Sequence, residues 1–372
     1  MGYDARMARD VPPTPPGGGT QPPPQRWKRR LVAALLSSVV CLGALELGGR
    51  IWAPRPAPPP RGLIEDELLG WGLPADSRFM WQGRQVTTNS LGLRGREPTA
   101  TAVPLRVLVV GDSSVFGFGL ADEQTFPAQL EQLLAPAGAI EVVNGGVPGY
   151  TCPQSAAQVG RLREIANPDV LVIYNQHSDV RVAEERDLLY TPAHLGALAN
   201  WGAGRLVGYL ALRVRTASAR PGTLLAGYES CLDEMVCDQQ AAGGAAVLAI
   251  AVGVWDVEGA DWTHPGDPAG YRSPQERPDE GADDPGAPYR AAMADVAART
   301  GSPLADLPTV FAGAGMGARA LFIDEVHPSA AGQELIAAAV RDAMIDGGLV
   351  KLAGSGDPNE EPAPVPAPAA AN

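Results

Sequence analysis

The sequence has few cysteines and histidines, and their arrangement excludes a conventional metal centre. There are four of each among 372 residues, and no Cys and His residues have the spacing of metal ligands. Cys41 falls in an apolar run and Cys152 stands alone in the middle of the chain. Cys231 and Cys237 lie in a stretch with a helical pattern. They either form a disulfide in an oxidising compartment or remain two thiols. We therefore expect no metal site.

Basic residues are also scarce. Lys and Arg number 29 against 42 Asp and Glu, which gives a net charge of −13. Nucleic-acid binding needs a basic face, so we expect no nucleic-acid partner. The glycine-rich run at 145–149 lacks the Lys-Ser/Thr pair that follows the glycines of a phosphate-binding loop.

Proline and glycine are abundant, and they mark the ends of the folded part. The chain has 36 prolines and 44 glycines, concentrated at both termini and in one internal stretch. Residues 1–25 and 351–372 are predicted to be disordered tails. Residues 54–104 read as a proline-rich linker followed by a small β-hairpin, and 105–350 as one large α/β domain.

One long run lacks charge. Leu31–Leu45 contains no charged residue, and it follows a basic cluster of Arg26, Lys28, Arg29 and Arg30. Residues 26–53 are therefore predicted to form a single transmembrane signal anchor, with residues 31–53 in the membrane. Positive charge before the span keeps the N-terminus in the cytoplasm and places the remaining chain outside it. A cleaved signal peptide is the alternative interpretation.

From residue 105 the pattern predicts strands alternating with helices. Short apolar runs are typical of strands buried on both faces of a parallel sheet; they lie at 105–110, 140–143, 170–174, 245–251 and, more weakly, 304–307. Helical spacing predicts helices at 126–134, 289–298 and 329–345. This alternation predicts a doubly wound α/β sheet, with its ligand at the carboxyl ends of the strands.

Two segments interrupt the alternation. Residues 182–240 have a mainly helical pattern and form an insertion after the third strand. Residues 255–288 form a Pro/Gly/Asp-rich loop after the fourth strand. A loop of this length is either functional or disordered. We interpret it as a wall of the active site, with Trp255, Trp262 and His264 as candidate contacts.

Two short segments far apart in the chain carry the chemistry. Ser113 follows the first buried strand, and Asp324 and His327 lie three residues apart on a turn before the last helix. A serine becomes a nucleophile when an imidazole takes its proton and a carboxylate orients that imidazole. Ser114 is the alternative nucleophile. The other interpretation of the turn is a helix entry at which Asp324 acts only as a cap.

The motifs resemble those of the SGNH (GDSL-type) hydrolases. The blocks are residues 111–119 (Gly-Asp-Ser-Ser-Val-Phe-Gly-Phe-Gly), residues 144–151 (Asn-Gly-Gly-Val-Pro-Gly-Tyr-Thr) and Asp324-x-x-His327-Pro328, in the order found in the family. Residues 89–95 resemble the lead-in of membrane-attached bacterial members. The resemblance implies a flavodoxin-like fold, Ser113 as nucleophile, His327 as general base and acid, and Asp324 as its orienting partner.

The resemblance also implies an oxyanion hole. The backbone N–H groups of Ser113 and Gly149 are two of its donors, although Pro148-Gly149 is equally expected as a type II turn. The family's third donor is an asparagine directly before an aspartate. Alignment on Asp179 puts Ser178 at that position, and Asn175 or His177 could substitute for it.

The sequence thus predicts a membrane-anchored, extracytoplasmic serine esterase that uses no cofactor, because nucleophile and base are both protein groups. The resemblance implies a small-molecule, lipid or glycan ester as substrate, including O-acetyl groups. Two alternatives remain open. An acyltransferase would pass the acyl group to a glycan hydroxyl, and a catalytically weakened member would bind a glycan or a protein partner without chemistry.

Overall fold

The structure is a computed structural model of the chain. It describes residues 26–52, 61–66, 69–99, 103–184, 201–204, 206–207, 210, 221–257 and 285–351. The predicted tails, apart from Lys351, and most of the predicted linker lie outside these residues. So do two of the three loop candidates, Trp262 and His264.

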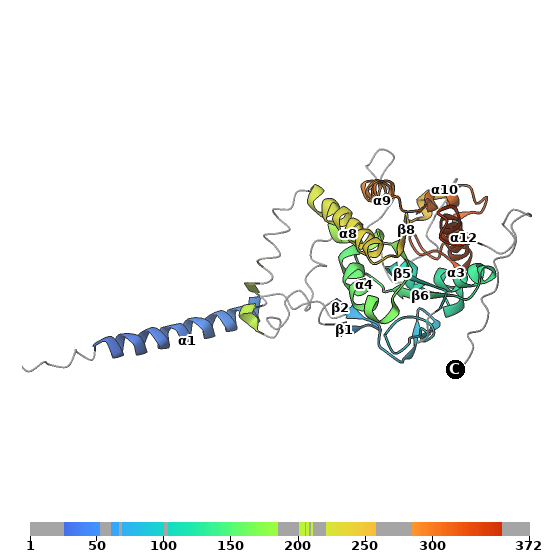
Figure 1. The fold of residues 1–372 in the computed structure, drawn as a ribbon. Helices are drawn as coiled ribbons and strands as arrows, with labels where there is room; N and C mark the ends of the chain where they lie inside the picture. The colour runs from blue at the N-terminus through green and yellow to red at the C-terminus, as the bar shows by residue number, and fades with distance from the viewer. Residues whose placement is uncertain are drawn as a thin grey trace, which may run out of the picture.

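A long helix precedes the folded domain. Helix α1 (Arg26–Trp52) is 27 residues long, and it extends away from the rest of the molecule in Figure 1. Its apolar side chains are exposed, and it is long and apolar enough to cross a membrane. A signal sequence has the same properties.

The domain is built on a five-stranded parallel sheet. Its strands are β5 (Leu105–Gly111), β6 (Ile140–Gly146), β7 (Val170–Tyr174), β8 (Ala245–Ala249) and β9 (Leu304–Ala305). Their order in the sheet is β6-β5-β7-β8-β9, and every neighbouring pair is parallel. This confirms the predicted flavodoxin-like, doubly wound sheet. The order reverses between β5 and β7, which is where such folds bind ligands.

Helices cover both faces of the sheet (Figure 1). One face carries α3 (Phe126–Leu134), α10 (Leu307–Ala312), α11 (Ala318–Leu321) and α12 (Ala330–Asp346). The other carries α4 (Cys152–Ala166), α8 (Pro221–Ala241) and α9 (Ala287–Thr300). The helices predicted at 126–134, 289–298 and 329–345 are confirmed. Ser329 caps α12, because its hydroxyl accepts a hydrogen bond from the backbone N–H of Gly332.

Short elements complete the domain, and most of them border the carboxyl ends of the strands. They are α2 (Ser113–Phe116), α5 (His177–Glu184) and three 3₁₀ turns, η1 (Asp122–Gln124), η2 (Ala135–Ala137) and η5 (Val254–Asp256).

The segment before the sheet forms two small antiparallel hairpins rather than one. They pair β1 (Ile64–Asp66) with β2 (Gly70–Gly72) and β3 (Arg78–Trp81) with β4 (Arg84–Thr87). We call residues 61–99 the lead-in. Its side chains form an apolar cluster with Phe116 of α2, so the lead-in packs directly on the element that begins with Ser113. The first buried layer around this serine is therefore built partly by residues upstream of the sheet.

The structure corrects the cysteine pairing considered from the sequence. Cys231 is buried and Cys237 is exposed, and both lie in helix α8. Six residues along an α-helix rise about 9 Å, which exceeds the Cα separation of about 7 Å that a disulfide can bridge. Cys231 instead contacts Cys152 at the start of α4, with the two Sγ atoms 2.6 Å apart.

Candidate active site

Ser113 lies at a sharp corner between β5 and α2. Gly111 ends the strand, and a Cβ there would lie 2.0 Å from the carbonyl oxygen of Tyr174, so only glycine fits. Asp112 caps α2, because its carboxylate accepts a hydrogen bond from the backbone N–H of Ser114 at 3.0 Å. The corner presents Ser113 as the first residue of the helix, beyond the carboxyl end of β5 and next to the point where the strand order reverses.

His327 joins Ser113 to Asp324. Its Nε2 is 2.8 Å from Ser113 Oγ, and its Nδ1 is 2.6 Å from Asp324 Oδ2. The other carboxylate oxygen of Asp324 accepts hydrogen bonds from the backbone N–H groups of Val326 and His327. Asp324 is therefore both a turn cap and the partner of the imidazole, so the two interpretations of this turn hold together.

The environment of Asp324 favours its ionised form. Burial alone raises the pKa of this carboxyl, but the hydrogen bond and charge of His327 and two backbone N–H donors outweigh burial. The pKa of Asp324 therefore lies below its ordinary value. An ionised Asp324 accepts a hydrogen bond from the Nδ1–H group of His327, which leaves Nε2 as the acceptor for the Ser113 hydroxyl.

Ser114, the alternative nucleophile, is buried. Its hydroxyl donates to the carbonyl of Val326 at 3.3 Å, and its own carbonyl accepts from the side chain of Gln333 at 2.9 Å. Gln333 also accepts from the backbone N–H of Phe126, so it links α12 to the nucleophile corner. We call residues 324–327 the histidine turn. The Ser114 hydroxyl holds this turn against the corner, whereas the imidazole bonds the hydroxyl of Ser113.

Gly149 lies in a tight turn beside Ser113's helix. The backbone N–H of Tyr150 donates to the carbonyl of Val147, and Gly149 has a φ of +82°, as the third position of a type II turn requires. We call residues 147–150 the oxyanion turn, after the role that the family resemblance implies for Gly149. Its conformation matches the turn interpretation.

A tryptophan from the lead-in holds the oxyanion turn. Trp71 donates its indole N–H to the carbonyl of Pro148 at 2.9 Å. In return, the hydroxyl of Tyr150 donates to the carbonyl of Trp71 at 2.6 Å. A Cβ on Gly149 would lie 3.2 Å from the Trp71 ring, so the indole packs closely against this glycine. The sequence predicted only a small β-hairpin at this place, and nothing in it linked that hairpin to residue 149.

The segment after β7 contains the candidate third donors. The backbone N–H and the hydroxyl of Ser178 both point to Asp112 Oδ2, each at 3.3 Å. The side-chain amide of Asn175 donates to the carbonyl of Tyr150 at 3.4 Å. His177 Nε2 donates to the carbonyl of Val252 at 3.1 Å, and burial lowers the pKa of His177, which keeps it neutral. All three candidates therefore already bond protein groups.

Asp179 is a buried carboxyl with an unusual charge state. Its Oδ1 accepts a hydrogen bond from the backbone N–H of Cys152 at 2.9 Å, and its Oδ2 has no partner among the described residues. Burial raises the pKa of Asp179 to about 8; the Cys152 hydrogen bond opposes this shift, and the charge of Asp112 adds to it. Asp179 is therefore mainly protonated at pH 7, directly after Ser178.

Two further side chains border the site without having been singled out from the sequence. Arg94 of the lead-in is buried, and its guanidinium donates to the carbonyls of Phe116, Gly117 and Leu120 and pairs with Asp122. It thus satisfies the carbonyl end of the helix that Ser113 begins. The ring of Phe118 stacks on the imidazole of His327. Arg94 and Phe118 lie in the segments 89–95 and 111–119, which resemble family motifs, but a match to a motif does not show which residues they contact.

One side of the site is formed by the start of the predicted loop wall. The backbone N–H of Val254 donates to the carbonyl of Glu325, so η5 is attached to the histidine turn. Trp255 packs edge-on against His177, with ring centroids 6.3 Å apart. No described residue accepts a hydrogen bond from its buried indole N–H. Trp255 is thus the one loop candidate that the structure places beside this segment.

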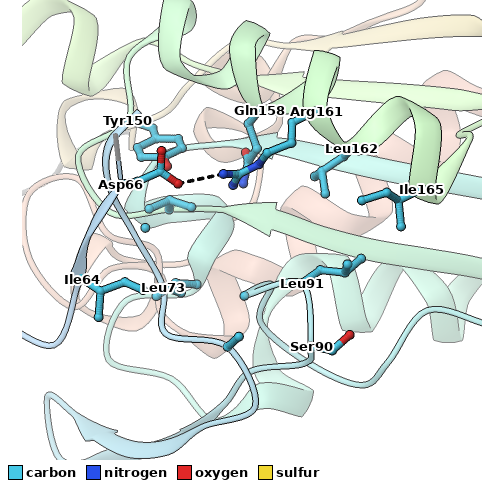
Figure 2. A pocket seen from close by; sticks show the side chains of 14 residues that line it. Ile64, Asp66, Leu73, Ser90, Leu91, Tyr150, Gln158, Arg161, Leu162 and Ile165 are labelled. Atoms are coloured by element: carbon cyan, nitrogen blue, oxygen red, sulfur yellow. Dashed lines mark hydrogen bonds and ion pairs between the residues drawn. The ribbon is translucent and has the colours of Figure 1, made fainter. Parts of the chain in front are cut away.

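A cavity of about 270 Å³ lies between the lead-in and α4 (Figure 2). Val147 and Tyr150 of the oxyanion turn contribute to its lining. Figure 2 shows the ion pair of Asp66 and Arg161, with oxygen and nitrogen 2.7 Å apart, next to the ring of Tyr150. The cavity therefore borders the same turn that carries Gly149.

Comparison with known proteins agrees with this geometry. The GDSL-like Lipase/Acylhydrolase family matches residues 109–335, which is more than half of the chain and includes every residue of the Ser113–His327–Asp324 array. The chain belongs to this family. The resemblance stated from the three motif blocks is thereby confirmed, and the protein is an ester hydrolase by family.

Several solved structures are similar to this GDSL-family chain. LAE5, an alpha/beta hydrolase enzyme from the metagenome of Lake Arreo, is 20% identical, with 66% of this chain and 96% of that chain covered and a TM-score of 0.43. Axe2, an acetylxylan esterase from Geobacillus stearothermophilus, is 17% identical, with 66% and 96% covered and a TM-score of 0.41. TesA is 18% identical, with 65% and 99% covered and a TM-score of 0.42. No curated protein sequence matches the chain.

Proposed function

We propose that this GDSL-family protein is a membrane-anchored, extracytoplasmic serine esterase that cleaves carboxylic esters through an acyl-enzyme. The observation that carries the proposal is the position of His327, which bonds Ser113 Oγ at 2.8 Å on one side and Asp324 at 2.6 Å on the other. This is the arrangement that a nucleophile, a base and an orienting carboxylate need.

The reaction then follows from the proton positions. Ser113 Oγ attacks the ester carbonyl carbon while His327 Nε2 takes the hydroxyl proton. Asp324 keeps the proton on Nδ1 in place and stabilises the imidazolium. The backbone N–H groups of Ser113 and Gly149 are the proposed donors to the oxyanion of the tetrahedral intermediate. When this intermediate collapses, His327 returns its proton to the leaving alcohol.

Deacylation repeats these steps with water. His327 Nε2 removes a proton from a water molecule, whose oxygen attacks the acyl carbon on Ser113. The Ser113 oxygen leaves and recovers its proton from the imidazole. An acceptor hydroxyl in place of water would make the same machinery an acyltransferase. We propose hydrolysis, because the family that matches the chain is one of lipases and acylhydrolases.

The proposed location rests on the charge around α1. Four basic residues lie at the start of this helix, and they favour a cytoplasmic N-terminus. The folded domain begins after the helix, so it would lie on the other side of the membrane. An O-acetyl or lipid acyl ester in the cell envelope is the substrate class that fits this location.

A fluorophosphonate probe tests the nucleophile. Such a probe forms a covalent bond with an activated serine, so we expect labelling of the wild type and none of Ser113→Ala. Ser114→Ala is the matched control: it removes the neighbouring hydroxyl and its bond to the carbonyl of Val326, so labelling should be slower than in the wild type but not lost. A folded wild type that does not react would instead favour the catalytically weakened, binding alternative. Protease protection of membrane vesicles tests the orientation of the domain.

A further inference from the structure

Two buried cysteines meet behind the oxyanion turn. Cys152 is the first residue of α4, Cys231 lies in α8, and their Sγ atoms are 2.6 Å apart although the residues are 79 positions apart in sequence. Helices α4 and α8 pack side by side (Figure 1). A shift of about 0.6 Å would bring the two sulfurs to the S–S bond length of about 2.05 Å.

The surroundings of the pair are apolar. Both cysteines belong to the cluster that fills the space between α4, α8, α9 and the sheet, together with Tyr228 and Leu232. Burial and the neighbouring Cys231 raise the pKa of the Cys152 thiol well above its usual value. A thiol that stays protonated is a poor nucleophile. The pair is buried, and its reduced form reacts slowly, so access of an external thiol or disulfide to either sulfur is restricted in the folded protein.

We propose that Cys152 and Cys231 are joined by a disulfide in the exported protein. The proposal rests on the extracytoplasmic location proposed above, since disulfides form and persist in oxidising compartments. Two S–H bonds break and one S–S bond forms. The two electrons and two protons pass to the disulfide of a thiol–disulfide oxidoreductase or of oxidised glutathione, which becomes two thiols. Cys237 takes no part.

The cross-link would fix the end of the oxyanion turn. Cys152 follows this turn after one residue, and its backbone N–H bonds Asp179, the neighbour of Ser178. A covalent bond from Cys152 to α8 would therefore anchor the first residue of α4. This residue lies between the turn that carries the proposed Gly149 donor and the segment after β7. It also closes a long loop, which restricts the unfolded chain.

Differential alkylation tests the bond in the full chain extracted from membranes. The protein is denatured and treated with N-ethylmaleimide, then reduced, treated with a heavy-isotope form of the reagent, and digested for mass spectrometry. We expect the light label on Cys41 and Cys237 and the heavy label on Cys152 and Cys231. Without reduction, a peptide joining positions 152 and 231 should be found. Light label on Cys152 and Cys231, or a peptide joining 231 and 237, overturns the proposal.

Two controls separate this result from the proposed function and from loss of packing. Fluorophosphonate labelling of an undenatured portion of the same preparation reports on Ser113 independently of the cysteines. Cys231→Ser should lower the melting temperature by about 5–10 °C, and Cys237→Ser should leave it unchanged. Wild-type protein refolded in the presence of dithiothreitol should have the same melting temperature as the Cys231→Ser variant. If it still melts like the oxidised protein, the bond does not contribute and the proposal is wrong.

Discussion

The ring of Phe118 lies nearly parallel to the imidazole of His327, with centroids 4.1 Å apart and planes 18° apart. Phe118 follows Ser113 by five residues, so the segment that carries the proposed nucleophile also supports the proposed base. This contact limits the rotation of the imidazole about its bond to Asp324. The alignment of Nε2 with Ser113 Oγ thus depends on a side chain that takes no part in proton transfer.

Replacement of Phe118 should therefore slow turnover more than it weakens binding. A stacked aromatic pair contributes about 0.5–1.5 kcal/mol, so we expect Phe118→Ala to lower kcat up to about tenfold. Phe118→Tyr keeps the stacked ring and should retain most of the rate. Steady-state kinetics on a p-nitrophenyl ester checks both variants. A change confined to KM would show that Phe118 binds the acyl group and does not position His327.

Loss of the Trp71 indole N–H should disturb the oxyanion turn. Trp71→Phe keeps an aromatic ring beside Gly149 but removes the hydrogen bond to Pro148, and a neutral hydrogen bond is worth about 1 kcal/mol. We expect kcat to fall about fivefold. The matched control is Trp81→Phe in the same lead-in, because no described residue accepts from the Trp81 indole. An equal loss in both variants would mean that only packing of the lead-in matters.

The raised pKa of Asp179 should make the free energy of unfolding fall as the pH rises. Its pKa is about 8 in the folded protein and about 3.9 when unfolded, so between these values the unfolded state releases a proton that the folded state keeps. The free energy of unfolding should then fall by up to about 1.4 kcal/mol per pH unit from about pH 4 to pH 8. Asp179→Asn removes this titration. Thermal melts at pH 5 and pH 8 should differ less in this variant than in the wild type.

Ser178→Asn should raise turnover. Ser178 has one hydroxyl proton, which points to Asp112, whereas an asparagine amide has two N–H donors. One can keep the bond to Asp112 and the other can face the oxyanion. Removal of one such donor costs about 10²–10³-fold in kcat, and for the added donor we expect a gain of about tenfold. Ser178→Ala is the control and should show no gain. A folded asparagine variant with an unchanged rate would indicate that the proposed hole is already complete.

The fold followed from local patterns to a large extent. Buried apolar runs such as Val107–Val110 mark the parallel strands, and helical spacing marks Phe126–Leu134, which the structure reproduces residue for residue. These signals are local because a doubly wound sheet requires each strand to be apolar on both faces. The two-residue strand Leu304–Ala305 gave the weakest signal, since it pairs over only two positions.

The contacts around the site could not be read in the same way. The roles of Trp71, Arg94 and Phe118 depend on which segments meet in space, and such contacts leave no periodic trace in the sequence. The cysteines show the same limit. Only five residues separate Cys231 from Cys237 in the sequence, which suggested a local pairing, whereas the helix holds them apart and brings Cys231 to Cys152.

The reach of Arg94 has a practical consequence for any attempt to isolate the soluble enzyme. The family match begins at residue 109, yet Arg94 supplies three carbonyl contacts to the segment after Ser113. A fragment that begins at residue 109 would lack the guanidinium that donates hydrogen bonds to these carbonyls. It would also lack the apolar side chains of the lead-in that cover Phe116. The minimal expressible unit should start near residue 61, just past the proline spacer, and a cut at 105 should yield insoluble protein.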